Sequence, residues 1–142
     1  MKERIVPGTM AKPVGSYSHA TKVKAKEFIF VAGQVPIDEE GRVVGVNRDD
    51  KLRNHQTIDL AAQVRQTMLN VKAALEAAGA TFDDLVRVDT FVVASAMNEY
   101  RTVGVKTKHD ILGVHVGGAT VFVAGLMIPE ALIEIAAVAA ID

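Results

Sequence analysis

Apolar residues recur at spacings of three and four over residues 58–78, which predicts the longest helix of the chain. The apolar stripe consists of Leu60, Val64, Met68, Val71 and Leu75. Thr57 is the expected N-cap, because its hydroxyl can accept a hydrogen bond from the first turn, and Asp59 suits the positive end of the helix dipole. Gly79 is well placed to end the helix because glycine adopts the left-handed conformation readily.

Strand patterns lie on both sides of this helix. Residues 17–24 and 27–32 predict two strands joined by a tight turn, and the second ends at Gly33 because glycine and proline interrupt strands. Residues 37–56 are polar and loop-like, with a short strand expected at 42–46. The elements expected after the long helix are strands at 85–94, 118–125 and 132–141 and a weaker helix at 96–109.

The expected order of elements is ββ-α-β-α-ββ, which places the chain in the α+β class as a single domain over residues 1–142. Each helix has only one apolar stripe, so both helices are expected to cover the same face of a mixed sheet. The last two strands are apolar on both faces and therefore need cover on both. Two helices cannot supply the second cover, so the sequence predicts an oligomer in which this face meets other subunits.

Composition narrows the classes of function. Hydrophobic residues make up 49% and charged residues 23%, and a net charge of −1 gives no global field that would attract nucleic acid or an anionic membrane. The absence of cysteine excludes disulfides and thiolate metal sites. No apolar run reaches the roughly 18 residues of a spanning helix, and the N-terminus lacks the apolar run of a signal peptide. We therefore expect a cytoplasmic protein without membrane or nucleic-acid partners.

Four segments, in order along the chain, resemble the YjgF/RidA family, which is also described as endoribonuclease L-PSP. Residues 15–20, Gly-Ser-Tyr-Ser-His-Ala, resemble the family's opening Gly-Pro-Tyr-Ser-Gln-Ala, and residues 28–36 resemble its Phe-x-Ser-Gly-Gln-x-Pro strand end. Residues 66–79 resemble the first helix of the family, with its asparagine and its terminal Ala-Gly. Residues 133–139, Ile-Glu-Ile-Ala-Ala-Val-Ala, resemble the closing strand. Together these segments span nearly the whole chain.

The resemblance implies a chorismate-mutase-like α+β fold and a homotrimer, with its sheets forming a barrel and small-molecule clefts between subunits. Known members of the family include imine and enamine deaminases, whose chemistry uses no metal and no organic cofactor. The resemblance places Tyr17, Gly33, Gly118 and Glu134 in the cleft. In this family the glutamate is thought to orient or activate the water that attacks the imine carbon. Glu134 is therefore the candidate catalytic residue, and the other three are candidate substrate-binding positions.

The chain departs from the family pattern close to this cleft. Gly118 stands where the family carries an arginine that grips the substrate carboxylate through a bidentate pair. The second helix lacks the family's Asn-x-x-Tyr, with Gly104 and Thr107 at those places, and Ala32 replaces a frequent serine. We therefore expect little activity on 2-imino carboxylates. His115 is a candidate for supplying the lost cationic character, although a loop histidine is usually just solvated.

Two of the candidates have structural alternatives. Glu134 lies in an otherwise apolar strand, where an unpaired carboxylate is costly to bury. It is either the water-activating base or an interface carboxylate that is hydrogen-bonded to backbone. Tyr17 is either a wall of the cleft or an aromatic side chain of the subunit interface.

Other polar residues are weaker candidates. A basic stripe in the first strand pattern is more typical of a solvated strand edge than of a nucleic-acid contact, and it comprises Lys22, Lys24 and Lys26. No metal site is expected, because the remaining histidines lack ligand spacing: they are His19, His55 and His109.

Three functions from different classes remain open at this point. The first is a hydrolase or deaminase that acts on an imine or enamine not anchored by arginine. The second is a trimeric module that binds a metabolite or partner without turnover, and fold resemblance alone cannot separate the two. The third, an endoribonuclease, is disfavoured by the acidic balance and by the scarcity of aromatic residues for base stacking.

Overall fold

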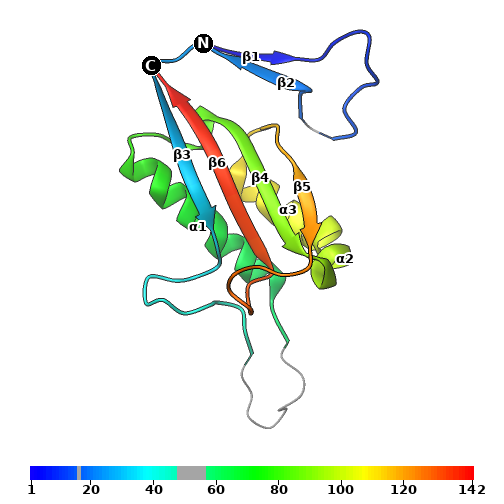
Figure 1. The fold of residues 1–142 in the computed structure, drawn as a ribbon, viewed down its shortest axis with the longest axis vertical. Coiled ribbons are helices and arrows are strands. Elements are labelled where there is room, and N and C mark those ends of the chain that lie inside the picture. Colours follow the sequence, from blue (N-terminus) through cyan, green and yellow to red (C-terminus); the bar gives the residue numbers. More distant parts are fainter. Residues whose placement is uncertain (16, 48–56) are drawn as a thin grey trace.

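A four-stranded mixed sheet forms the centre of the molecule (Figure 1). The computed structural model describes residues 1–15, 17–47 and 57–142. Strands β4 and β5 run parallel, and the other neighbouring strands are antiparallel. In spatial order the strands are β3 (Glu27–Gln34), β6 (Ile133–Ile141), β4 (Leu85–Val93) and β5 (Thr120–Val123).

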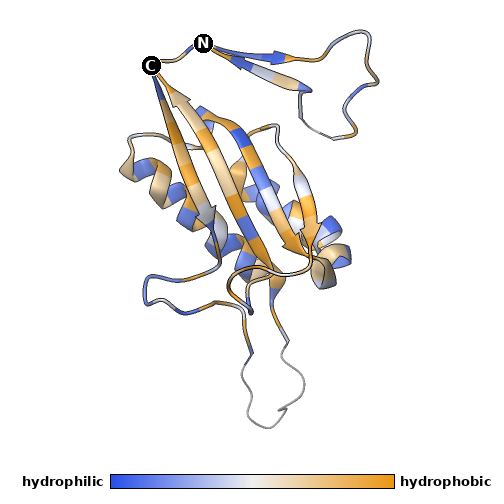
Figure 2. Ribbon diagram, viewed as in Figure 1, coloured by the Kyte–Doolittle hydropathy of each residue, from blue (hydrophilic) through white to orange (hydrophobic). Residues whose placement is uncertain are grey.

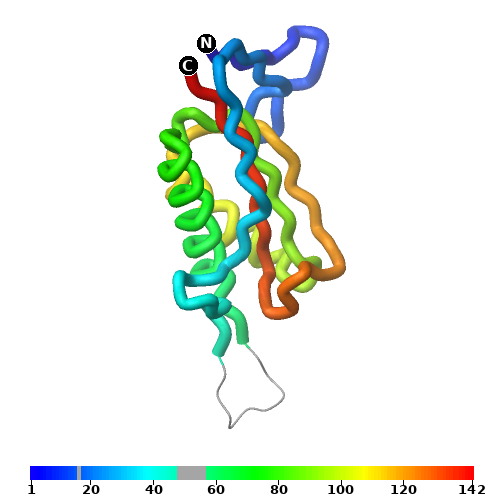
Figure 3. Tube along the Cα trace, turned by 60° about the vertical axis from the view of Figure 1, so that its left-hand side comes forward, coloured from blue at the N-terminus to red at the C-terminus, as the bar shows by residue number. Residues whose placement is uncertain are grey.

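Helices cover one face of this sheet, as predicted, and Figure 3 shows α1 running along that side. Helix α1 spans Leu60–Ala77. A 3₁₀ turn at Phe82–Asp84 precedes β4. The second helical stretch is longer than expected and consists of a 3₁₀ turn (Ala94–Ala96), α2 (Met97–Glu99), a π-turn (Tyr100–Gly104) and α3 (Val105–Leu112). No helix in the described ranges is both long and apolar enough to cross a membrane.

The predicted apolar stripe of α1 is confirmed, since all five of its residues are buried. The predicted N-cap was wrong by two residues. Asp59 is the cap, and its Oδ1 accepts a hydrogen bond of 2.9 Å from the Ala62 N–H. A carboxylate at this position satisfies a free donor and also complements the helix dipole. Gly79 follows the helix with φ of +79°, as its residue type predicted.

The predicted hairpin between the first two strands was wrong. Strand β2 (Ala20–Val23) pairs with β1 (Lys2–Ile5) in a separate two-stranded sheet, while β3 pairs with β6. Opposite charges face each other in the β1–β2 pair, where Glu3 is opposite Lys22. Strand β3 is apolar and finds an apolar partner in β6, with Phe30 opposite Val138.

The expected strand at 42–46 is reduced to isolated bridges, which join Ile37 to Val43 and Val46 to Ile58. The buried Gln63 side chain fixes this loop to the rest of the fold. Its amide donates to the carbonyls of Val44, at 3.1 Å, and Glu130, at 2.9 Å, and accepts from the Leu132 N–H at 2.8 Å. Residues 48–56, including His55, and residue 16 lie outside the described residues.

The other face of the sheet carries no helix, and the strands that form it are largely hydrophobic apart from hydrophilic positions on β4 (Figure 2). Phe30 is 78% exposed there and Phe28 49%, while Val121 on β5 is 41% exposed. Burial alternates along β6, so that Ile133, Ile135, Ala137 and Ala139 are buried against the helices and the residues between them face the open side. An apolar sheet face of this kind is the feature that predicted an oligomer.

Candidate functional site

Glu134 lies on β6 and faces the open side of the sheet, where its carboxylate lies against Gly33 at the end of β3. A side chain at position 33 would overlap Oε1 of Glu134 and would place its Cβ 2.9 Å from Cδ. Gly33 has no left-handed backbone, so its lack of a side chain serves to make room for the carboxylate. Within the described ranges, Glu134 makes no hydrogen bond or ion pair. It is a half-buried acceptor that is free to hold a water.

Gly118 lies directly against the backbone of β4. A Cβ at this position would overlap the carbonyl oxygen of Val88 and would lie 2.6 Å from its carbonyl carbon. Backbone hydrogen bonds on either side hold Gly118 close to β4. The Val88 N–H donates to the Gly117 carbonyl at 3.0 Å, and the Thr90 N–H donates to the Ala119 carbonyl at 2.8 Å. Position 118 therefore accepts no side chain unless the strands move apart.

Asp89 holds the backbone beside Gly118. Its Oδ1 accepts from the Ala119 N–H at 2.8 Å, and its Oδ2 accepts from Nε of Arg87 at 2.7 Å. The Arg87 hydrogen bond is the largest influence on Asp89 and lowers the pKa of its carboxyl, and the Ala119 N–H lowers it further against the opposing effect of burial. Arg87 lines the same hollow as Gly118, and its charge is shared with this carboxylate.

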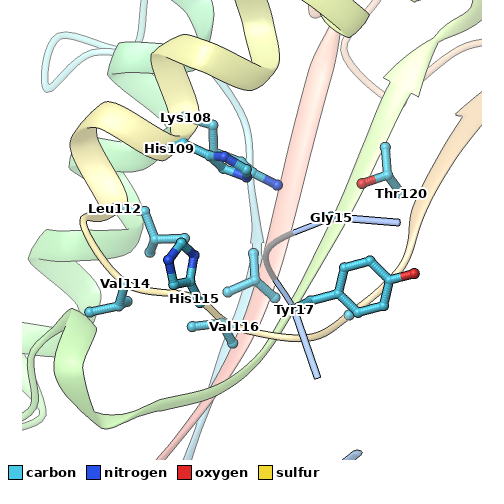
Figure 4. Close-up of a pocket in the computed structure, with 11 residues that line it drawn as sticks. Gly15, Tyr17, Lys108, His109, Leu112, Val114, His115, Val116 and Thr120 are labelled. Atoms are coloured by element: carbon cyan, nitrogen blue, oxygen red, sulfur yellow. The ribbon is translucent and has the colours of Figure 1, made fainter. Parts of the chain in front are cut away.

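Two cavities flank the Gly118 backbone. One opens on the helix-free side and is lined by Tyr17, Phe28, Arg87 and Gly118 among others. The second cavity, of about 340 Å³, lies beside α3, and its lining includes Tyr17, Gly118 and His115 (Figure 4). The structure thus brings together three of the five predicted site residues.

The other two predicted residues, Gly33 and Glu134, line neither of these cavities. Gly33 instead borders a third hollow beside α1. Within one described chain the predicted site therefore consists of two separate groups: the Glu134 group, with Gly33, and the Gly118 group, with Tyr17 and His115.

Tyr17 is held in a half-exposed position by its neighbours in the N-terminal loop. Its ring makes an edge contact with His19 at 6.5 Å between ring centroids, and Nε2 of His19 lies 2.8 Å from the Ala11 carbonyl oxygen. Tyr17 is 43% exposed and borders both cavities beside Gly118. It is therefore a wall of either cavity.

The endoribonuclease L-PSP family matches residues 8–141 of this chain. The chain belongs to this family, the YjgF/RidA family. A RutC family protein of Pyrococcus horikoshii is 38% identical over 101 residues, which are 70% of this chain and 68% of that protein. The alignments cover only 61% and 58% of two further RutC family proteins, from Pyrococcus abyssi and Saccharolobus solfataricus.

Two further family members bear on fold and function. The Rid family protein YyfB of Yersinia pestis, a protein of unknown function, superposes with a TM-score of 0.77 at 31% identity, covering 99% of this chain and 98% of that one. The 2-iminobutanoate/2-iminopropanoate deaminase of Salmonella typhimurium is 29% identical over 72% of this chain and 68% of its own length. These matches confirm the family and the α+β fold that the sequence predicted.

One departure of this YjgF/RidA chain from the family pattern has a packing reason. At Gly104, a Cβ would overlap the ring of the buried Tyr100, so this ring occupies the space of a side chain at that position. Burial raises the pKa of the Tyr100 hydroxyl, and the hydroxyls of Thr90 and Thr120 beside it oppose that rise. The family's asparagine position has thus become part of the core.

Sequence reasoning missed Lys108, whose side chain lines the cavity beside α3 (Figure 4). Its Nζ donates to the hydroxyl of Thr90 at 3.2 Å, and burial lowers the pKa of the amine. The available signal was its position four residues before Leu112, which puts it on the buried side of α3. Next to it, burial and then the charges of Lys108 and His115 lower the pKa of His109, against a smaller opposing effect of Asp110.

Proposed function

We propose that this protein is a cofactor-free hydrolase that deaminates a small imine or enamine, with Glu134 as the general base. The observation that carries the proposal is the free carboxylate of Glu134, held in the space that Gly33 leaves open. The reaction is R₂C=NH + H₂O → R₂C=O + NH₃, and an enamine enters it through its imine tautomer. The named activity of the Salmonella typhimurium relative, an imine deaminase, supports this reaction class.

Glu134 would act on water. Its carboxylate accepts a proton from a water molecule as the water oxygen attacks the imine carbon, and then returns the proton to the departing nitrogen. A half-buried carboxylate without a competing donor is suited to this role, since its lone pairs are available to the water.

The site is completed in our proposal by a homotrimer that buries the apolar sheet face with Phe28, Phe30 and Val121. The Glu134 group and the Gly118 group would then meet across the subunit boundary, with Tyr17 of one subunit as a wall for the ligand bound by another. This arrangement explains why one chain holds the predicted site in two parts. It also matches the cleft position that the family resemblance implies.

The substrate in this proposal does not depend on an arginine for binding. Position 118 has no room for a side chain, and Arg87 already shares its charge with Asp89. A bidentate arginine–carboxylate pair contributes about 1.5–3 kcal/mol, so its loss costs more than tenfold in affinity or rate for a 2-imino carboxylate. Uncharged imines and enamines lose nothing by this change and are the expected substrates.

Ammonia release from a panel of imines tests the proposal. The panel contains 2-aminoacrylate, generated in the assay, together with larger imino acids and uncharged enamines. We expect release above the uncatalysed rate for an uncharged member and little acceleration for 2-aminoacrylate. Acceleration of 2-aminoacrylate hydrolysis to the rate of arginine-bearing relatives would contradict the substrate class.

A non-catalytic binding module is the second candidate, and it is favoured by the missing arginine itself. It predicts saturable binding of a panel member in calorimetry without any ammonia release. Binding without turnover across the whole panel would replace the enzyme proposal by this one.

A further inference from the structure

We propose that Lys108 is a nucleophilic amine that binds a small carbonyl compound, preferably a 2-oxo acid, as a covalent imine in the cavity beside α3. The cavity has a volume of about 340 Å³, which accommodates a molecule of a few heavy atoms. Figure 4 shows the Lys108 amine directed toward the space bordered by Thr120, Tyr17 and His115. This cavity is lined by the Gly118 group and so borders the proposed deaminase site, but adduct formation on Lys108 uses neither Glu134 nor deaminase turnover.

Among the described residues, no carboxylate is paired with the Lys108 amine. Its described hydrogen bond goes to the neutral Thr90 hydroxyl, which is fully buried. Leu112 and Val88 contribute apolar surface to the same cavity. An ammonium in such a place loses hydration without gaining a carboxylate, and the lowered pKa of Lys108 follows from this burial. Desolvation of this kind favours the neutral amine, which is the nucleophilic form of lysine.

The neighbouring lysine on α3 has the opposite surroundings. Lys106 is exposed, and its Nζ lies 2.6 Å from the carboxylate of Asp110. Lys106 therefore differs from Lys108 in both exposure and pairing, and it is a matched control on the same helix. Asp110 opposes the lowering of the pKa of the neighbouring His109 but does not line the cavity. The described lining residues of the cavity include no carboxylate.

Hydrogen-bond donors on the lining give the cavity a preference for an anionic ligand. His109 and His115 line it together with Lys108. A carboxylate beside the reacting carbonyl would lie among hydrogen-bond donors with no acidic side chain to repel it. This preference distinguishes a 2-oxo acid from a neutral ketone or aldehyde of the same size.

The proposed step is an ordinary condensation and needs no oxidant or reductant. The Lys108 nitrogen lone pair attacks the carbonyl carbon, the C–N bond forms, and the carbonyl oxygen takes a proton. The resulting carbinolamine loses that oxygen as water, leaving R₂C=N–Lys108, and addition of water reverses the step. His109, His115 and Tyr17 border the cavity and are the titratable groups of its described lining, besides Lys108, that could exchange a proton with the oxygen.

Borohydride trapping with pyruvate as the probe tests this proposal. The folded full-length protein is incubated with pyruvate at pH 7, reduced, and analysed by intact mass and peptide mapping. We expect one dominant adduct on Lys108, about tenfold more abundant than the mean adduct on exposed lysines. The adduct should disappear in Lys108→Met and persist in Lys106→Met. Adducts spread evenly over surface lysines would overturn the proposal, and wild-type mapping alone gives this result if Lys108→Met does not fold.

A competition experiment and a Glu134 variant extend the trapping test. Propionaldehyde, which lacks the carboxylate, should compete weakly with pyruvate for Lys108 when concentrations are corrected for intrinsic reactivity; equal competition would overturn the preference for a 2-oxo acid. The same trapping in Glu134→Gln should give the wild-type amount of adduct on Lys108. Loss of the adduct in that variant would show that the amine does not act as an independent site.

Discussion

The carboxylate of Glu134 occupies the space in which a side chain at Gly33 would lie, so the two residues form one structural unit across β6 and β3. The clash involves the end of a flexible side chain and not backbone. A larger residue at position 33 would therefore move the carboxylate while the sheet stays intact.

Gly33→Ala is accordingly expected to reduce imine hydrolysis by about tenfold or more, the cost of misplacing a general base, with little loss of thermal stability. The informative control is the same substitution in a Glu134→Ala background. There it should have no further effect on rate, because the group that it displaces is already gone. If Gly33→Ala lowered the rate equally in both backgrounds, its effect would not act through the Glu134 carboxylate.

At Gly118 the clash is with backbone, so the expected result is different. Gly118→Ala should destabilise the fold by about 1–3 kcal/mol, the usual cost of overpacking, because β4 and the 117–119 segment must separate. Gly125→Ala is the control, since a Cβ there has open space around it. Urea unfolding of both variants measures the difference. We also expect Gly118→Arg to disrupt the pairing of β4 with the 117–119 segment and not to restore carboxylate binding.

Asp89 makes the stability of the β4–β5 region dependent on pH. Its pKa is lowered in the folded protein, chiefly by Arg87, so its contribution is present above its unfolded value of about 4 and is lost as the pH falls toward the folded value. Asp89→Asn should therefore lower the urea midpoint at pH 7, and the gap to wild type should narrow below about pH 4. A gap that stays constant down to pH 3 would show that the ionised form is not stabilised.

The apolar sheet face gives a prediction about assembly. Light scattering of the wild-type protein should report a mass near three chains, and Phe30→Asp should yield monomers because it places a charge on the open face. Leu69→Asp replaces another exposed apolar residue, on α1 and away from the open sheet face, and should leave the mass unchanged. A wild-type monomer at micromolar concentration would remove the basis for a site shared between subunits.

The sequence predicted the parts of the fold that depend on one local pattern. The α1 stripe and the strands β4 and β6 lie close to where periodicity put them, because each buries one continuous face. The partner of β2 was mispredicted. Proximity in sequence suggested β3, whereas the true partner is β1, in which Glu3 lies opposite Lys22 and 19 residues before it in the chain. Long-range pairing of this kind leaves little trace in a local pattern.

The candidate site was predictable only in part. Residue types and family resemblance pointed to Glu134 and Gly33, but the steric reason for pairing them appears only in three dimensions. Lys108 was missed because a lysine in a mostly polar helix looks solvated. The cavity that it lines is completed by residues 114–118 and by the N-terminal loop. Burial of a single polar residue depends on such distant segments.

The measurement that tests the central claim most directly is the rate of ammonia release by Glu134→Gln, with the best imine of the panel, beside its mass and melting temperature. The substitution keeps the shape of the side chain and removes its charge. If Glu134 is the base, the variant keeps the wild-type mass and stability and loses roughly 10²–10⁴-fold in rate. A variant that hydrolyses the imine at the wild-type rate would contradict the account.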